Sequence, residues 1–174
     1  SRFAAIADVA AEMGVDVGLL QQITFGDYRI DGPHPWHRLE RGEITLDEAR
    51  CLILLEGEKH KLKTDIYEML ARFAAVERGI RGPLVDKTLE WKRRGYRIGM
   101  VTNNIREFTS WKTAFPFVLE DVFEVVADSS CLGVRKPNRQ IFDYALQQLQ
   151  LPPAEVLFLD DYPANVAAAN ALGI

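Results

Sequence analysis

The feature that most constrains the fold is a run of four apolar residues that ends in two adjacent carboxylates. Residues 156–159 read Val-Leu-Phe-Leu, and Asp160 and Asp161 follow at once. A short apolar run of this kind is typical of a strand buried in a parallel sheet. Open α/β sheets bind their ligands at the carboxyl ends of their strands. The run therefore predicts a strand that brings two carboxylates to the functional edge of such a sheet.

Two further apolar segments end in polar residues in the same way. Residues 97–101 run into Thr102 and Asn103, which bring a hydroxyl and an amide. Residues 124–127 lead through a turn to Lys136, which stands just before a proline that opens a helical pattern. Parallel strands joined by helical crossovers have their carboxyl ends at one edge of the sheet. We therefore expect a hydroxyl, an amide, a cation and paired carboxylates in one site.

The two halves of the chain differ in their apolar pattern. Before residue 77 every apolar segment has helical spacing, and Thr45 with Glu48 forms a capping box that opens one helix. Beyond Pro83 helices and strands alternate. The expected helices there are 83–94, 106–112, 137–149 and 164–172, and the expected strands are 97–101, 124–127 and 156–159. We predict an all-helical domain over residues 1–81 and an α/β core, a Rossmann-like parallel sheet flanked by helices, over residues 82–174.

Composition excludes some classes of function. With 48% apolar and 26% charged residues, the 174-residue chain can bury a sizeable core. A net charge of −4 gives no electrostatic footprint for nucleic acid, and no apolar run is long enough to span a bilayer. Cys51 and Cys131 are too few and too far apart for a metal motif. We therefore expect reduced thiols and a cytoplasmic protein without nucleic-acid or membrane partners.

Three motifs in this order and spacing resemble a known family. Val-Thr-Asn-Asn at 101–104, Gly-Val-Arg-Lys-Pro-Asn at 133–138, and Phe-Leu-Asp-Asp at 158–161 followed by Asn165 resemble the second, third and fourth motifs of the haloacid dehalogenase-like (HAD) hydrolase superfamily. The helical half resembles, more loosely, the cap of the branch that contains the phosphatase domain fused to soluble epoxide hydrolases. The resemblance implies a helical cap over a HAD-like core. We interpret Asn165 as a residue that supports the turn or the helix start rather than one that touches substrate.

The resemblance also implies a role for each residue of the predicted site. Lys136, Thr102 and Asn103 would bind the oxygens of a phosphoryl group. Asp160 and Asp161 would hold Mg²⁺, a hard cation that favours carboxylate oxygens. In relatives the second carboxylate of this pair tends to touch the metal, and the first acts directly, through water or by holding the lysine. The implied function is Mg²⁺-dependent hydrolysis of a small phosphorylated metabolite through an aspartyl-phosphate.

The aspartate that would form this intermediate is missing. The family's first motif ends a strand in Asp-x-Asp or a variant of it, and no Asp-x-Asp occurs in the 174 residues. We therefore interpret the chain as an internal fragment of a longer hydrolase and expect no useful turnover from the fragment itself. A relative without a nucleophile is the alternative interpretation. Two other functions stay open: a haloacid dehalogenase, which needs no metal and against which the carboxylate pair argues, and a non-catalytic HAD-like domain.

Taken singly, each site residue also has a structural interpretation. Lys136 would be a solvated loop residue. Thr102 and Asn103 would cap the following helix, and Asp160 or Asp161 would be the N-cap of the last helix. The joint order of the motifs favours the site over these separate interpretations.

In the helical half, the sequence favours structural roles. Trp36 and His37 are interpreted as packing residues rather than as contacts to substrate. Residues 52–55 form an apolar stripe that packs either between cap helices or against a second subunit, so a homodimer stays open. The neighbouring charged residues are interpreted as a solvated helix face, and they are Arg38, Glu40, Arg41 and Glu43.

Overall fold

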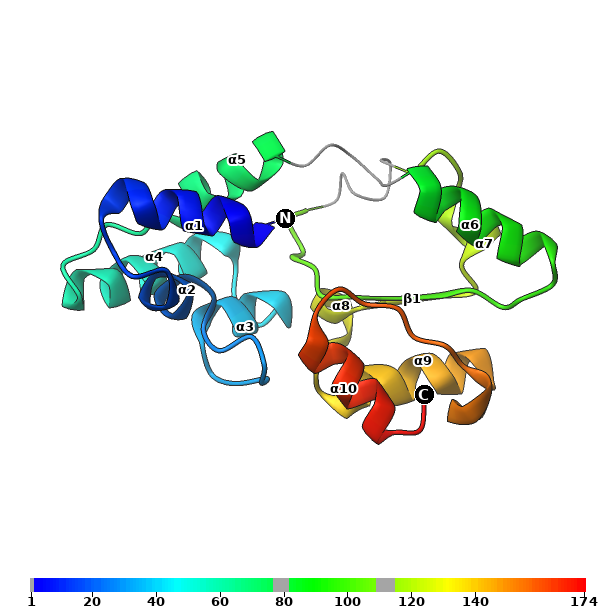
Figure 1. Cartoon of the computed structure of the whole chain (residues 1–174). Helices are drawn as coiled ribbons and strands as arrows, with labels where there is room; N and C mark the ends of the chain where they lie inside the picture. The colour runs from blue at the N-terminus through cyan, green and yellow to red at the C-terminus, as the bar shows by residue number, and fades with distance from the viewer. Residues whose placement is uncertain (1, 77–81, 109–114) are drawn as a thin grey trace.

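The first half of the protein is a set of packed helices, as the apolar spacing predicted (Figure 1). The computed structural model describes residues 2–76, 82–108 and 115–174. The helices of the first half are α1 (Arg2–Met13), α2 (Val17–Phe25), α3 (Pro35–Glu40), α4 (Leu46–Lys59) and α5 (Ile66–Val76). The predicted capping box is present, because Thr45 accepts from the backbone of Glu48 and the Glu48 side chain accepts from the backbone of Thr45.

These helices enclose one hydrophobic cluster. Leu39, Ile53 and Ile66 are completely buried in it. Of the apolar stripe at 52–55, Ile53 alone is completely buried, and Leu52 and Leu55 are exposed. Ile105, which follows the first strand of the second half, is buried in the same cluster. The end of that strand is therefore anchored in the helical half.

The second half has the α/β arrangement that the sequence predicted. Its elements are α6 (Gly82–Arg93), β1 (Gly99–Thr102), α7 (Leu119–Val122), β2 (Val125–Asp128), α8 (Ser129–Leu132), α9 (Arg139–Leu149), the 3₁₀ turn η2 (Pro153–Glu155) and α10 (Pro163–Ala171). Strands β1 and β2 are parallel, with Gly99 opposite Val125 and Thr102 opposite Asp128. The carboxyl ends of the two strands therefore lie at the same edge.

The expected strand at 156–159 is not a strand in the structure, so that prediction was wrong. The segment has the exposure pattern of an extended chain, since Leu157 and Leu159 are 77% and 59% exposed whereas Phe158 packs edge-on against Phe142 at 5.2 Å. A strand also needs a hydrogen-bonded neighbour, and the only sheet in the described part of the chain consists of β1 and β2. The apolar run therefore stays unpaired beside the core.

Two other expectations concern the edges of the described residues. The predicted helix at 106–112 is a turn at 106–107, and its second part lies outside the described residues.

A second hydrophobic cluster, which includes Ala127 and Ile141, lies wholly after residue 82. The predicted domain boundary at 81/82 adjoins residues 77–81, outside the described part, and stays a prediction. None of the described helices is long and apolar enough to cross a membrane.

Candidate active site

Lys136 joins two of the predicted strand ends. Its Nζ donates to the carbonyl oxygen of Val101 in β1 at 2.8 Å and to Oδ2 of Asp160 at 2.6 Å. The side chains of Lys136 and Asp160 are 10% and 8% exposed, so this ion pair is largely shielded from water. The interpretation of Lys136 as a solvated loop residue is therefore wrong. The structure brings the cation and the first carboxylate together at the sheet edge.

Asn103 holds the main chain of Lys136 from both sides. The backbone N–H of Lys136 donates to Asn103 Oδ1 at 2.8 Å, and Asn103 Nδ2 donates to the Lys136 carbonyl oxygen at 3.1 Å. Asn103 thus serves the lysine rather than capping a helix. Thr102, the last residue of β1, is partly buried, and its hydroxyl has no hydrogen-bond partner among the described residues. That hydroxyl is therefore one polar group at this edge that remains open to a ligand.

Asp160 is held by three donors. Its Oδ1 accepts from the backbone N–H of Tyr162 at 2.8 Å and from Nδ2 of the buried Asn165 at 3.0 Å, while Oδ2 accepts from Lys136. Helix α10 has Tyr162 as its N-cap, without a side-chain cap bond, so neither Asp160 nor Asp161 caps it. Of the three roles that the resemblance leaves to the first carboxylate, holding the lysine is the one that this geometry displays.

Asp161 differs from Asp160 both in its exposure and in its lack of partners. Its side chain is exposed and has no ion pair or hydrogen bond within the described residues. The described residues contain no cluster of three or more His, Cys, Asp or Glu side chains that could hold a metal ion. Mg²⁺ is, however, usually bound through one or two carboxylates, several waters and substrate phosphate. The free oxygens of Asp161 fit the chemistry of such a site.

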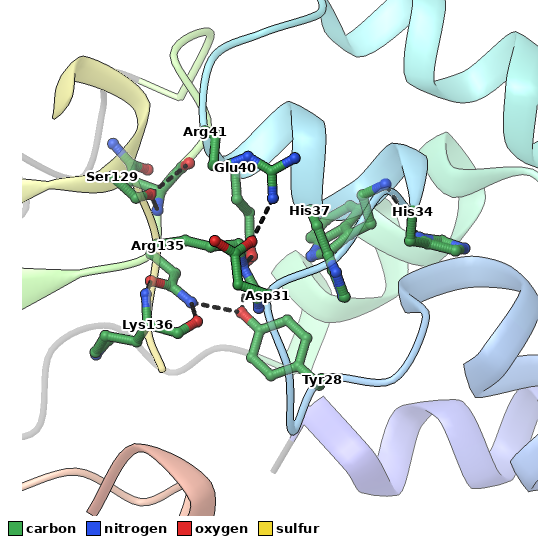
Figure 2. A network of polar contacts seen from close by, with 12 residues as sticks. Tyr28, Asp31, His34, His37, Glu40, Arg41, Ser129, Arg135 and Lys136 are labelled. Carbon is green, nitrogen blue, oxygen red and sulfur yellow. Dashed lines mark hydrogen bonds and ion pairs between the residues drawn. The ribbon is translucent and has the colours of Figure 1, made fainter. Parts of the chain in front are cut away.

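Beside Lys136 lies a buried network that the sequence did not predict (Figure 2). Arg135 Nε donates to Glu40 Oε2 at 2.7 Å, with side-chain exposures of 0% and 5%. Tyr28 donates its hydroxyl to Glu40 Oε1 at 2.6 Å, and the Arg135 guanidinium lies 4.4 Å from the centre of the Tyr28 ring. The ring of Tyr28 also packs edge-on against Tyr162 at 5.2 Å. The network therefore connects the helical half to the residues around Lys136.

The interpretation of the charged residues in and just after α3 as a solvated face is wrong for two of them. Glu40 is buried against Arg135, and Arg41 is 11% exposed and forms an ion pair with Asp31. Burial raises the pKa of Glu40, while the charge of Arg135 acts in the opposite direction. Burial, followed by the nearby Glu40 carboxylate, raises the pKa of Tyr28. The hydroxyl of Tyr28 thus keeps its proton as a donor to Glu40.

Trp36 and His37 are packing residues, as the sequence predicted. Trp36 is buried edge-on against Phe25 with ring centres 4.8 Å apart. His37 is 1% exposed and accepts the backbone N–H of Gly32 through Nδ1 at 3.1 Å. Burial and the charge of Arg135 lower the pKa of His37 to about 3. A neutral imidazole therefore fills this part of the core.

Comparison with known proteins agrees with the fold and the motifs. A family model described as haloacid dehalogenase-like hydrolase matches residues 3–173. The chain is 31% identical over 144 residues to mouse acyl-CoA dehydrogenase family member 10. This alignment covers 80% of the chain but only 13% of that protein. It is 28% identical to rat bifunctional epoxide hydrolase 2 over an alignment of 181 residues, which covers 97% of this chain and 32% of that protein.

Other similar proteins are nearer to this chain in length. A phosphoglycolate phosphatase from Nitrosococcus oceani is 31% identical over 129 residues, which is 67% of this chain and 54% of that protein. A HAD family enzyme from Bacteroides thetaiotaomicron, solved in complex with magnesium and inorganic phosphate, superposes with a TM-score of 0.61 at 26% identity, over 89% of this chain and 80% of that one. The chain belongs to the haloacid dehalogenase-like hydrolase family.

Proposed function

We propose that the protein containing this chain is a Mg²⁺-dependent phosphatase that hydrolyses small phosphate esters. The observation that carries the proposal is the buried Lys136, whose ammonium group lies between the end of β1 and Asp160. Membership of a family described as hydrolases supports hydrolysis as the reaction. Similar proteins named as phosphatases support phosphate esters as the substrates, and a similar structure contains magnesium and inorganic phosphate.

The residues at the sheet edge match the needs of phosphoryl transfer. The reacting group carries negative charge on its nonbridging oxygens, so fixed cations and donors around it lower the barrier. In the proposed site Lys136 supplies the cation, the hydroxyl of Thr102 supplies a donor, and Asn103 and Asp160 orient the lysine. Asp161, next to Asp160, would hold Mg²⁺, which when bound supplies positive charge to the phosphate oxygens.

We further propose that the nucleophilic aspartate lies on a strand outside these 174 residues, between β1 and the unpaired segment at 156–159. The exposed Leu157 and Leu159 support this proposal, because a neighbouring strand would cover apolar side chains and pair the free backbone groups. The carboxylate would attack phosphorus as the ester P–O bond breaks, and the leaving alkoxide would take a proton from water, which the later hydrolysis returns. Water would then hydrolyse the aspartyl-phosphate, releasing inorganic phosphate and restoring the carboxylate.

The test is hydrolysis of p-nitrophenyl phosphate by the full-length protein, whose coding sequence upstream of residue 1 is read first. We expect activity that requires Mg²⁺ and falls at least ~100-fold in Lys136→Met, the loss typical of removing one donor to a developing charge. The control is Lys87→Met, which breaks the exposed ion pair with Glu90 far from the site. Activity of the full-length protein that survives Lys136→Met, or its absence with Mg²⁺ present, would refute the proposed function.

Residues 1–174 by themselves give a separate check of the nucleophile. Residues 1–174 alone should not hydrolyse p-nitrophenyl phosphate, because none of the described carboxylates is both free and placed beside Lys136. Clear activity of this chain that is abolished by Asp161→Ala would overturn the account of a nucleophile on another strand.

A further inference from the structure

We propose that Glu40 and Arg135 are positioning residues, which fix the backbone of Lys136 against the helical half of the protein. This inference rests on the proposed function of Lys136 as the cation of the site. It concerns a pair of residues that are 95 positions apart in the chain and that meet in a buried ion pair.

The guanidinium of Arg135 is fixed from several sides by the helical half. Nε donates to Glu40 at 2.7 Å, Nη1 donates to the carbonyl oxygen of Ile30 at 2.8 Å, and the ring of Tyr28 lies 4.4 Å away. The second oxygen of Glu40 is occupied by the Tyr28 hydroxyl. Figure 2 shows the side chains of Tyr28, Glu40 and Arg135 gathered in one place beside Lys136. Because Arg135 is completely buried, no solvent replaces these contacts.

Because Arg135 and Lys136 are joined by one peptide bond, fixing Arg135 also restricts the backbone of Lys136. On the other side, Asn103 holds both the N–H and the carbonyl of Lys136, and its Nδ2 is 3.5 Å from the Tyr28 hydroxyl. The backbone of Lys136 is thus fixed by the helical half through Arg135 and by β1 through Asn103. A lysine side chain is flexible, so a fixed backbone together with Asp160 determines where its ammonium group lies. Catalytic groups lose efficiency when they are displaced by more than about 0.5 Å from the productive geometry.

General stabilisation explains this pair less well than positioning does. The cost of desolvating two charges offsets much of their attraction, so a buried ion pair is weak evidence for stability. Other contacts hold the two halves together away from Lys136, among them the bond from the backbone N–H of Leu46 to Glu107 at 2.8 Å and the burial of Ile105. The planar fork of Arg135 adds a defined direction, which an apolar pair at the same place would lack.

The experiment uses two conservative variants of the full-length protein. Glu40→Gln keeps the size of the side chain and one of its two acceptor oxygens, replaces the other with an NH2 donor and removes the charge. Arg135→Lys keeps the charge but loses the fork. The control is Arg50→Met, which removes the ion pair with Asp65 within the helical half, at a nitrogen–oxygen distance of 2.5 Å. We measure kcat and KM with p-nitrophenyl phosphate and, by NMR, the hydrogen exchange of the Lys136 amide, which donates to Asn103.

We expect kcat to fall at least fivefold in both variants with KM changed less than twofold, and no change in Arg50→Met. The Lys136 amide should exchange at least tenfold faster in Glu40→Gln, while the amide of Ala145, in the buried face of α9, is unchanged. Unchanged kcat and exchange in both variants would overturn the proposal. Equal acceleration at Lys136 and Ala145 would also overturn it, because that result indicates a general loss of stability. If the unmodified protein has no phosphatase activity, the proposed function fails, and the exchange rates alone decide whether the pair positions Lys136.

Discussion

Replacing Gly42 by alanine should weaken the contact between the helical half and α8. Gly42 follows α3 with a φ of +66°, and a Cβ at this position would lie 2.3 Å from the backbone oxygen of Ser130 and 2.8 Å from Nη2 of Arg106. The left-handed backbone costs an alanine roughly 1–2 kcal/mol. The overlap with a backbone oxygen requires a shift of packed structure, which typically costs a further ~1–3 kcal/mol. The free energy of unfolding should therefore fall by about 2–5 kcal/mol.

Gly14→Ala is the matched control for this prediction. Gly14 has nearly the same backbone angle, with φ at +65°, but its Cβ would meet nothing within 4 Å. Gly14→Ala should therefore cost only the backbone term, roughly 1–2 kcal/mol. Urea unfolding of both variants and of the unmodified protein measures the two losses. If the two variants lose the same free energy, Gly42 does not lie against Ser130 in solution and the reasoning is refuted.

Two further predictions concern a buried histidine and the unpaired apolar segment. Lowering the pH from 6.5 to 4.5 should reduce the free energy of unfolding of the unmodified protein by about 2 kcal/mol more than that of the His37→Gln variant. The reason is that His37 in the unfolded chain gains a proton near pH 6.5, whereas the folded residue, with a pKa of about 3, does not. Equal pH dependence of urea unfolding in the two proteins would contradict this. Leu159→Ala should lower the free energy of unfolding of residues 1–174 by less than ~0.5 kcal/mol, because the side chain is 59% exposed there. In a full-length protein whose extra strand covers Leu159, the same substitution should cost ~2 kcal/mol or more. Small losses in both proteins would argue against that strand.

Local sequence signals predicted the features that depend on neighbouring residues. The capping box at Thr45 needs only a glutamate three residues later, and it is present. The two paired strands followed from short apolar runs, and their parallel pairing followed from the predicted alternation of helices and strands beyond Pro83, although the predicted helix at 106–112 is a turn at 106–107. The meeting of Lys136 with Asp160 also agrees with the expectation that residues at strand ends converge. These features required no knowledge of tertiary packing.

The features that the sequence did not predict depend on distant partners. Glu40 lies among charged residues that suggest a solvated face, and nothing near it in the sequence indicates that Arg135 will cover it. The segment at 156–159 has the composition of a strand, but its secondary structure depends on a hydrogen-bonded neighbour that the described residues do not supply. In both cases the local pattern identified the kind of segment, but it contained no information about the distant residue or strand that the segment needs as a partner.

The pairing of Lys136 with Asp160 leaves the sheet edge with an uneven balance of charge. The lysine and the first aspartate neutralise each other at 2.6 Å, and Glu40 neutralises Arg135 nearby. Asp161, together with Asp128 at the end of β2, whose hydrogen bonds within the described part of the chain come only from the neutral Asn104 and Ser130, therefore leaves the edge with an excess of negative charge, which would repel a phosphate dianion that arrived alone. A divalent cation at Asp161 would offset this negative charge. In the proposed site, cation and anion would consequently strengthen each other's binding, so the apparent affinity for phosphate should rise with the Mg²⁺ concentration.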